Sequence, residues 1–223
     1  MSEKAQMRNK KTRETHRLVD LEAKTPNQKE YVRSIIDNDV VCCSGPAGSG
    51  KSFIAAGIAA HKLHCGETER IIVTRPLVCT GKDLGSLPGE MHDKIAPYLL
   101  PMKENLKHFL TQAFYGYYEN NGSIQYRPLE VMRGSTFHDS YMILDEAQNC
   151  TVDQIKMFIS RMGKNTKVLI NGDINQNDLR GQSGLKTVMD KLERIDGCGI
   201  CHLTYDDIQR NDLIGRILNA LEN

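Results

Sequence analysis

The sequence predicts an α/β domain built on a mostly parallel sheet with helices on both faces. Three observations predict this fold. Short apolar runs of strand character alternate with segments of helical spacing, and a glycine-rich loop joins the first strand to its helix. Such alternation requires crossover connections, which place successive strands in parallel. The strand segments are 40–41, 70–74, 141–144 and 167–171, and the helical ones are 53–64 and 152–162.

Composition is that of a globular domain. The 223 residues are 39% hydrophobic and 26% charged, and the net charge of +1 creates no global attraction to a polyanion. The chain has no apolar run long enough to predict a membrane span, and its polar start lacks a signal core. We therefore expect a cytoplasmic protein without a membrane partner, whose seven cysteines are thiols.

The predicted domain covers residues 25–223, preceded by a polar arm at 1–24. Residues 1–17 hold six Lys and Arg against two Glu, so the arm is either a basic contact for nucleic-acid phosphates or a solvated, frayed leader. Within the domain, residues 77–135 are irregular because glycine and proline interrupt short helical pieces, and they predict an insertion in the sheet topology.

The longest helical candidate of this insertion is 98–114. A hairpin is expected around 120–122, with 124–126 returning as a strand. Aromatic and basic side chains gather here, and they either stack nucleic-acid bases or pack the hairpin. These side chains are Tyr115, Tyr117, Tyr118, Lys103, Lys107 and Arg127.

The glycine-rich loop has the spacing G-x-x-x-x-G-K-S of a phosphate-binding loop, in the required strand–loop–helix context. Its residues are Gly45, Pro46, Ala47, Gly48, Ser49, Gly50, Lys51 and Ser52, and Phe53 follows in the helix. Glycines let backbone N–H groups turn toward phosphate oxygens, and the helix N-terminus adds its positive dipole. Lys51 is expected at the β- and γ-phosphates and the Ser52 hydroxyl on Mg²⁺.

A second strand ends in two adjacent carboxylates, Asp145 and Glu146. Downstream of a phosphate loop, this pattern predicts that Asp145 helps to hold Mg²⁺ and that Glu146 orients the attacking water. The structural alternative is a preference for acidic residues at a helix start.

Polar residues also follow the neighbouring strands. Thr74 and Arg75 end one strand, and Asp173 and Gln176 follow another, so all should lie on the same sheet edge as Lys51. Gln176 is either a sensor of the γ-phosphate or a loop amide that satisfies backbone groups. Arg180 and Arg210 are candidate stabilisers of transition-state charge, although an isolated arginine is usually only solvated.

Gln28 allows two interpretations. Thr25 predicts an N-cap with Pro26 at the first helical position, and Gln28 then completes a capping box. Alternatively, its amide offers the donor and acceptor needed at an adenine edge.

The run Cys198-Gly199-Ile200-Cys201-His202 matches the spacing of c-type haem attachment. That chemistry follows export, for which the chain shows no signal, and zinc would need a second ligand pair. We therefore expect a last strand here, without metal or haem.

Together these motifs resemble the PhoH family, whose members are P-loop ATPases with a single RecA-like domain related to superfamily 1 helicases. The matching segments, in the family's order, are 25–28, 45–52, 74–76, 84–89, 97–99, 132–134, 144–149, 172–179 and 183–185. The resemblance implies ATP and Mg²⁺ as cofactors, Gln28 as adenine reader, Asp145 and Glu146 as the hydrolysis pair and Gln176 as γ-phosphate sensor. Ser52 stands where the family usually has threonine, and either hydroxyl can bind Mg²⁺.

The resemblance also implies partners. Superfamily 1 motors hydrolyse ATP between two RecA-like lobes, and this chain has room for one, so we expect a homo-oligomeric ring, a hexamer, with Arg210 or Arg180 reaching a neighbour's nucleotide. The expected function is ATP hydrolysis coupled to binding or remodelling single-stranded nucleic acid, RNA rather than DNA. The alternatives are a non-enzymatic nucleotide-dependent assembly switch and, less favoured because of Glu146, a small-molecule kinase.

Overall fold

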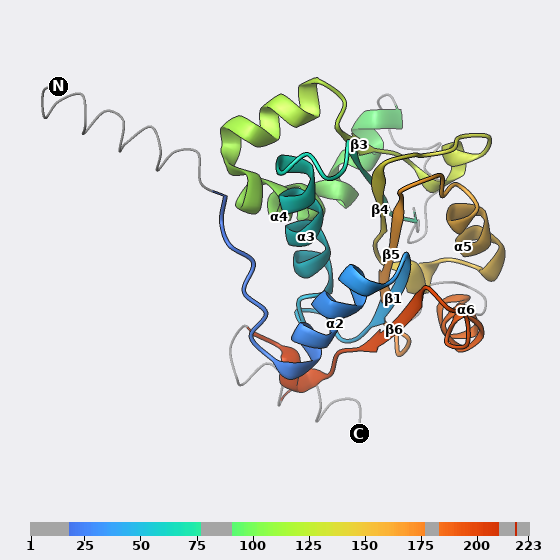
Figure 1. The fold of residues 1–223 in the computed structure, drawn as a ribbon. Coiled ribbons are helices and arrows are strands. Elements are labelled where there is room, and N and C mark those ends of the chain that lie inside the picture. Colours follow the sequence, from blue (N-terminus) through green and yellow to red (C-terminus); the bar gives the residue numbers. More distant parts are fainter. Residues whose placement is uncertain (1–17, 77–90, 177–182, 210–216, 218–223) are drawn as a thin grey trace, which may run out of the picture.

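A computed structural model describes residues 18–76, 91–176, 183–209 and 217 (Figure 1). Six strands form one sheet in the order β3-β2-β4-β5-β1-β6, and every neighbouring pair is parallel. The mostly parallel α/β architecture expected from the sequence is therefore confirmed. The strands are β1 (Val40–Ser44), β2 (Arg70–Thr74), β3 (Ile124–Tyr126), β4 (Ser140–Leu144), β5 (Lys167–Gly172) and β6 (Cys198–His202).

Helices cover both faces of the sheet because successive strand side chains point to opposite sides. On β1, Val41 and Cys43 join the core beneath three helices, α2 (Pro26–Asp37), α3 (Lys51–His64) and α4 (Met91–Asn120). Val40 and Cys42 face the other core, which is covered by α5 (Val152–Ile159), α6 (Leu185–Leu192) and the 3-10 turn η2 (Leu129–Met132). Two further 3-10 turns, η3 (Ala147–Asn149) and η4 (Tyr205–Asp207), follow β4 and β6.

The tyrosine-rich segment differs from the expected hairpin. The expected helical piece is α4, which is interrupted at Thr111 and runs on to Asn120. A turn at Gly122, with φ of 78°, leads into β3, which pairs parallel with β2 in the register Ile71 opposite Ile124. The residues before this turn are helical and β3 pairs parallel with β2, so the expected hairpin does not form, and this part of the expected insertion supplies an edge strand of the sheet.

The tyrosines themselves mostly pack. Tyr115 is buried and its hydroxyl donates to Glu119 at 2.8 Å, while Lys103 lies over the ring of Tyr126. Tyr117 differs, since it is 63% exposed.

The segment before α2 packs against the domain. Leu18 and Leu21 contact the core beneath α3 and α4, and the Val19 N–H donates to the Phe109 carbonyl at 3.3 Å. The expected arm therefore ends before residue 18, and residues 1–17 lie outside the described part of the chain.

The cysteine run forms strand β6, as expected. Cys198 and Cys201 are an odd number of residues apart, so their side chains leave opposite faces of the strand and cannot converge on one ion. The six cysteines in the described ranges are free thiols, and those ranges contain no cluster of His, Cys, Asp or Glu suited to a metal.

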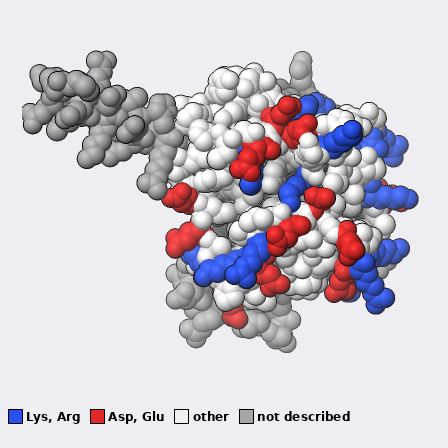
Figure 2. Space-filling view, in the orientation of Figure 1, with Lys and Arg blue, Asp and Glu red and all other residues white. Residues whose placement is uncertain are grey.

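Lys and Arg side chains are interspersed with Asp and Glu on the face seen in Figure 2, in keeping with the near-zero net charge. Among the described helices, none combines the length and hydropathy that a bilayer crossing requires.

A buried carboxylate, Asp207 of η4, ties the start of α2 to the segment that follows β6. It accepts hydrogen bonds from the Thr25 hydroxyl, from Asn27 Nδ2 at 2.9 Å, and from the N–H and hydroxyl of Thr204 at 2.6 and 3.2 Å. Burial by itself favours the neutral acid, but the hydrogen bonds from Asn27, Thr25 and Thr204 outweigh it and lower the pKa of Asp207.

We expect Asp207→Ala to lower the free energy of unfolding by about 2–3 kcal/mol, because it removes a charged, buried acceptor from several partly buried donors. The exposed neighbour Asp206→Ala is the control. Because the folded-state pKa is below that of an unfolded aspartate, the stabilisation is complete above about pH 4 and is lost as the pH falls through the folded-state pKa. Denaturant unfolding across pH measures both effects, and a variant as stable as the control would contradict them.

Candidate active site

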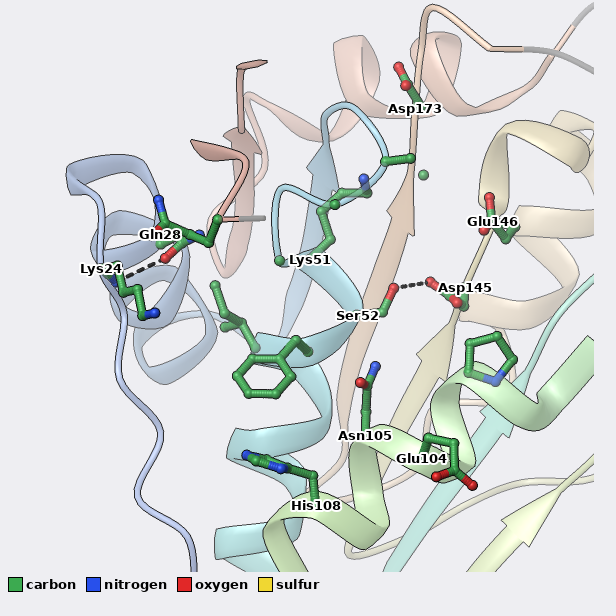
Figure 3. Close-up of a pocket in the computed structure, with 18 of the residues that line it drawn as sticks. Lys24, Gln28, Lys51, Ser52, Glu104, Asn105, His108, Asp145, Glu146 and Asp173 are labelled. Atoms are coloured by element: carbon green, nitrogen blue, oxygen red, sulfur yellow. Dashed lines mark hydrogen bonds between the residues drawn. The ribbon is translucent and has the colours of Figure 1, made fainter. Parts of the chain in front are cut away.

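The carboxyl ends of the central strands open into a cavity of about 890 Å³. The phosphate loop after β1, Arg75 after β2, Asp145 and Glu146 after β4, and Asp173 after β5 all line it. Figure 3 shows Lys51, Ser52, Asp145, Glu146 and Asp173 around the cavity. Parallel strands present their carboxyl ends at one edge, and this is where ligands bind in such sheets. The cavity is therefore lined by the motifs that the sequence predicts at this edge of the sheet.

The phosphate loop needs glycine at two positions for different reasons. Gly50 has φ of 99° and caps the start of α3, a conformation that other residues rarely adopt. At Gly45, a Cβ atom would lie 2.6 Å from the Leu203 carbonyl oxygen, so the loop can approach β6 only without a side chain. Lys51 Nζ donates to the carbonyls of Gly45 and Pro46, at 2.5 and 2.9 Å, and so lies within the loop's own curve.

Ser52 and Asp145 form the contact between the loop and β4. The Ser52 hydroxyl donates to Asp145 Oδ1 at 2.6 Å, and Figure 3 shows the two side chains pointing at one another. Burial raises the pKa of Asp145, as does the charge of Glu146, while Ser52, Arg75 and Lys51 oppose the rise. The pair offers only oxygen donors, with one carboxylate, and this fits a Mg²⁺ ion completed by phosphate and water rather than a protein cage.

Glu146 is held by two neighbours. Arg75 NH2 lies 3.0 Å from Glu146 Oε1, and Gln148 Nε2 donates to Glu146 Oε2 at 2.6 Å. Gln148 also accepts from the Asp173 N–H at 3.2 Å, which joins the ends of β4 and β5. The Arg75 and Gln148 contacts were not predicted. Their only sequence signals are a place directly after β2 and a place two residues beyond Glu146.

Gln28 lines the cavity but its contacts differ from the expected capping box. Its N–H donates to the Thr25 hydroxyl at 3.2 Å, which is half of the box. Its side-chain oxygen accepts from the Lys24 N–H at 2.9 Å instead of from Thr25. Its Nε2 donates to the carbonyls of Ser49 and Asp207, at 3.0 and 3.2 Å, so the amide fastens the phosphate loop to η4.

The remaining wall comes from α4 and from the segment before α2. Phe53 lies beside His108 and Phe109, with ring centroids 5.4 and 4.6 Å apart. Glu104 and Asn105 of α4 line the cavity on this side, as do Val19 and Lys24 and other residues of segment 18–24. Phe53 was expected here as the residue that follows the phosphate loop, and it lines the cavity. No motif marks the lining residues of α4 or of segment 18–24, because their place in the site depends on how these segments pack against α3.

Gln176, Arg180 and Arg210 are the remaining residues that the sequence predicts for the site. Gln176 is exposed, lines the cavity, and donates its N–H to the Asp173 carbonyl at 3.2 Å. Arg180 and Arg210 lie outside the described residues.

Comparison with known proteins identifies the family of this chain. The family model described as "PhoH-like protein" matches residues 20–222. A PhoH-like protein of Bacillus subtilis is 41% identical over 204 residues, which are 91% of this chain and 64% of that one. Protein PhoH of Escherichia coli K12 is 40% identical over 202 residues, 89% and 57% of the two chains. The chain thus spans little more than half the length of such relatives.

Similarity to solved structures extends to the fold. The large terminase of a thermophilic bacteriophage superposes with a TM-score of 0.55 at 12% identity, over 87% of this chain and 49% of that one. A second crystal form of that terminase, in complex with ADP, gives a TM-score of 0.50. The fold is thus the RecA-like fold of P-loop proteins, and by its sequence the chain belongs to the PhoH-like protein family.

Proposed function

We propose that this protein binds ATP with Mg²⁺ in the cavity and hydrolyses it. The observation that carries the proposal is the 2.6 Å hydrogen bond between Ser52 and Asp145, because it brings the phosphate loop and the paired carboxylates into one site. The P-loop fold and the membership of the PhoH-like family support an ATPase-type enzyme.

Each residue then has a defined task. The backbone N–H groups of the phosphate loop and the amino end of α3 bind the phosphates. Lys51 exchanges its loop carbonyls for the β- and γ-phosphate oxygens, a gain because hydrogen bonds between charged groups are the stronger ones. Glu146, whose side chain is 36% exposed toward the cavity, orients the attacking water. Gln176 senses the γ-phosphate.

Ser52 and Asp145 would hold the magnesium ion. When bound, Mg²⁺ neutralises the phosphate charge that develops during transfer. Asp145 must be ionised for this role. Burial and the charge of Glu146 raise its pKa, and the hydrogen bond from the Ser52 hydroxyl opposes this rise.

Gln28 gives a prediction that separates its two roles. Gln28→Ala removes the bonds to Ser49 and Asp207, so we expect ATP affinity to fall about tenfold as the loop loosens. If Gln28 also reads adenine, ATP will lose more affinity than GTP. Equal losses for the two nucleotides would leave it only the loop-fastening role, and unchanged affinity would contradict both. Asn27→Ala, which also removes one bond to Asp207, is the control.

The coupled process is binding or remodelling of single-stranded nucleic acid, RNA rather than DNA. The kinship of the PhoH family with superfamily 1 helicases supports this part. Tyr117, 63% exposed and 5.3 Å from the ring of Tyr118, is the tyrosine of its cluster available for base stacking.

A homo-oligomeric ring of six subunits would supply the positive charge that stabilises the transition state of hydrolysis. Among arginines in the described ranges, Arg75 alone lines the cavity, and it is engaged with Glu146. A further arginine would have to come from elsewhere, and Arg180 or Arg210 of a neighbouring subunit is our candidate.

One experiment tests the whole proposal. Phosphate release from ATP is measured with Mg²⁺, alone and with single-stranded RNA or DNA, on protein whose mass in solution is known. Turnover stimulated by RNA in a hexamer is the expected result. Turnover by a monomer, without stimulation by RNA or DNA, would contradict the proposed ring and nucleic-acid partner but would support the ATPase activity. Nucleotide binding without turnover would favour an assembly switch.

A further inference from the structure

Arg75 occupies an unusual place for an arginine, between the hydrolytic carboxylate and α4. It follows β2 directly, and its side chain is 24% exposed. NH2 pairs with Glu146 Oε1 at 3.0 Å, while NH1 donates to the Tyr98 carbonyl of α4 at 2.9 Å. The guanidinium is thus fixed at both ends, which its planar fork permits and an ammonium group does not.

Glu146 needs such support. Its backbone adopts the left-handed conformation, with φ of 57° and ψ of 42°, which is uncommon for a residue other than glycine. Backbone outliers of this kind persist where their surroundings fix them, and they cluster at functional sites. Arg75 on one carboxylate oxygen and Gln148 on the other fix the side chain in rotation and in plane.

The two contacts still leave the carboxylate able to act. Each carboxylate oxygen has two acceptor sites, so Arg75 and Gln148 leave room for the hydrogen of a water. The Glu146 side chain is 36% exposed and lines the cavity.

We propose that Arg75 is a positioning residue for hydrolysis: it sets the direction of the Glu146 carboxylate and links it to α4. This inference rests on the proposed ATPase function. Arg75 acts through Glu146 and binds neither ATP nor Mg²⁺, so its loss reduces kcat and leaves KM for ATP almost unchanged.

The test compares Arg75→Ala and Arg75→Lys with the wild type in Mg²⁺-dependent ATP hydrolysis. A small misplacement of a reacting group costs up to about 100-fold, so we expect kcat of Arg75→Ala to fall about 10- to 100-fold. Arg75→Lys should recover part of the loss, since it restores the charge but not both contacts. The exposed Arg194→Ala is the matched control and should behave as wild type.

Two further readouts exclude a merely structural role. Low, non-denaturing guanidinium should raise the kcat of Arg75→Ala and not that of Arg194→Ala. In a Glu146→Gln background, Arg75→Ala should cause little further loss, because both changes act on one carboxylate.

The outcomes separate clearly. A raised KM with normal kcat would make Arg75 a nucleotide ligand, and an undiminished second loss in the Glu146→Gln background would make it independent of Glu146. Either result, or a kcat of Arg75→Ala equal to wild type, would overturn the inference and leave the ATPase standing. An inactive wild type would instead contradict the ATPase itself, and the inference with it.

Discussion

Glu146→Gln should abolish steady-state ATP hydrolysis while leaving ATP bound. The substitution keeps the size and shape of the side chain but removes the charge that orients and polarises water, so we expect kcat to fall about 10²- to 10⁴-fold. ATP affinity should change little, because the carboxylate faces the cavity beside the phosphate loop and is not one of the groups proposed to bind phosphate.

The measurement is phosphate release beside equilibrium binding of a fluorescent ATP analogue. Glu130→Gln, on the exposed side of η2, is the control for loss of an acidic charge. Full turnover by Glu146→Gln would show that another group activates the water. Loss of turnover with the cellular role intact would identify an assembly switch instead of a motor.

Lys51→Ala is expected to act earlier, on binding. The ammonium group would make charged hydrogen bonds to the β- and γ-phosphates, and one such bond is worth about 1.5–3 kcal/mol. We therefore expect the Kd for ATP to rise at least about 10- to 150-fold in Lys51→Ala. Hydrolysis should fall further, because the same charge stabilises the transition state.

Titration with ATP and Mg²⁺ checks this expectation. Lys186→Ala removes an exposed lysine whose pair with Asp190 contributes little, and it serves as the control. Thermal unfolding separates loss of binding from loss of structure, since Lys51 also donates to the loop carbonyls of Gly45 and Pro46. Unchanged affinity in a folded Lys51→Ala protein would place the triphosphate elsewhere.

Local patterns predicted the parts of the site that are built locally. The phosphate loop depends on residues adjacent in sequence, and the strand before Asp145 is an apolar run buried on both faces. Because parallel strands end at one edge, these two motifs were expected to meet, and the Ser52–Asp145 hydrogen bond shows that they do.

The parts of the fold and of the site that were not predicted depend on contacts between segments far apart in the sequence. Tyr115 and Tyr118 favour strands by intrinsic preference, yet they lie on α4, where tertiary packing decides. The Arg75–Glu146 pair joins the segments that follow β2 and β4, which are far apart in the sequence, and no periodicity encodes such a pairing. Gln28 shows the same limit. Its side-chain oxygen accepts from the Lys24 N–H instead of completing the capping box at Thr25, and its Nε2 donates to Ser49 and Asp207.

A crystal structure of the wild type with Mg²⁺ and a non-hydrolysable ATP analogue tests the central claim most directly. We predict the triphosphate in the phosphate loop, Lys51 on the β- and γ-phosphates, the metal held by Ser52 and Asp145, and an ordered water between Glu146 and the γ-phosphate. A nucleotide bound away from this sheet edge, or a γ-phosphate beyond the reach of any water held by Glu146, would contradict it.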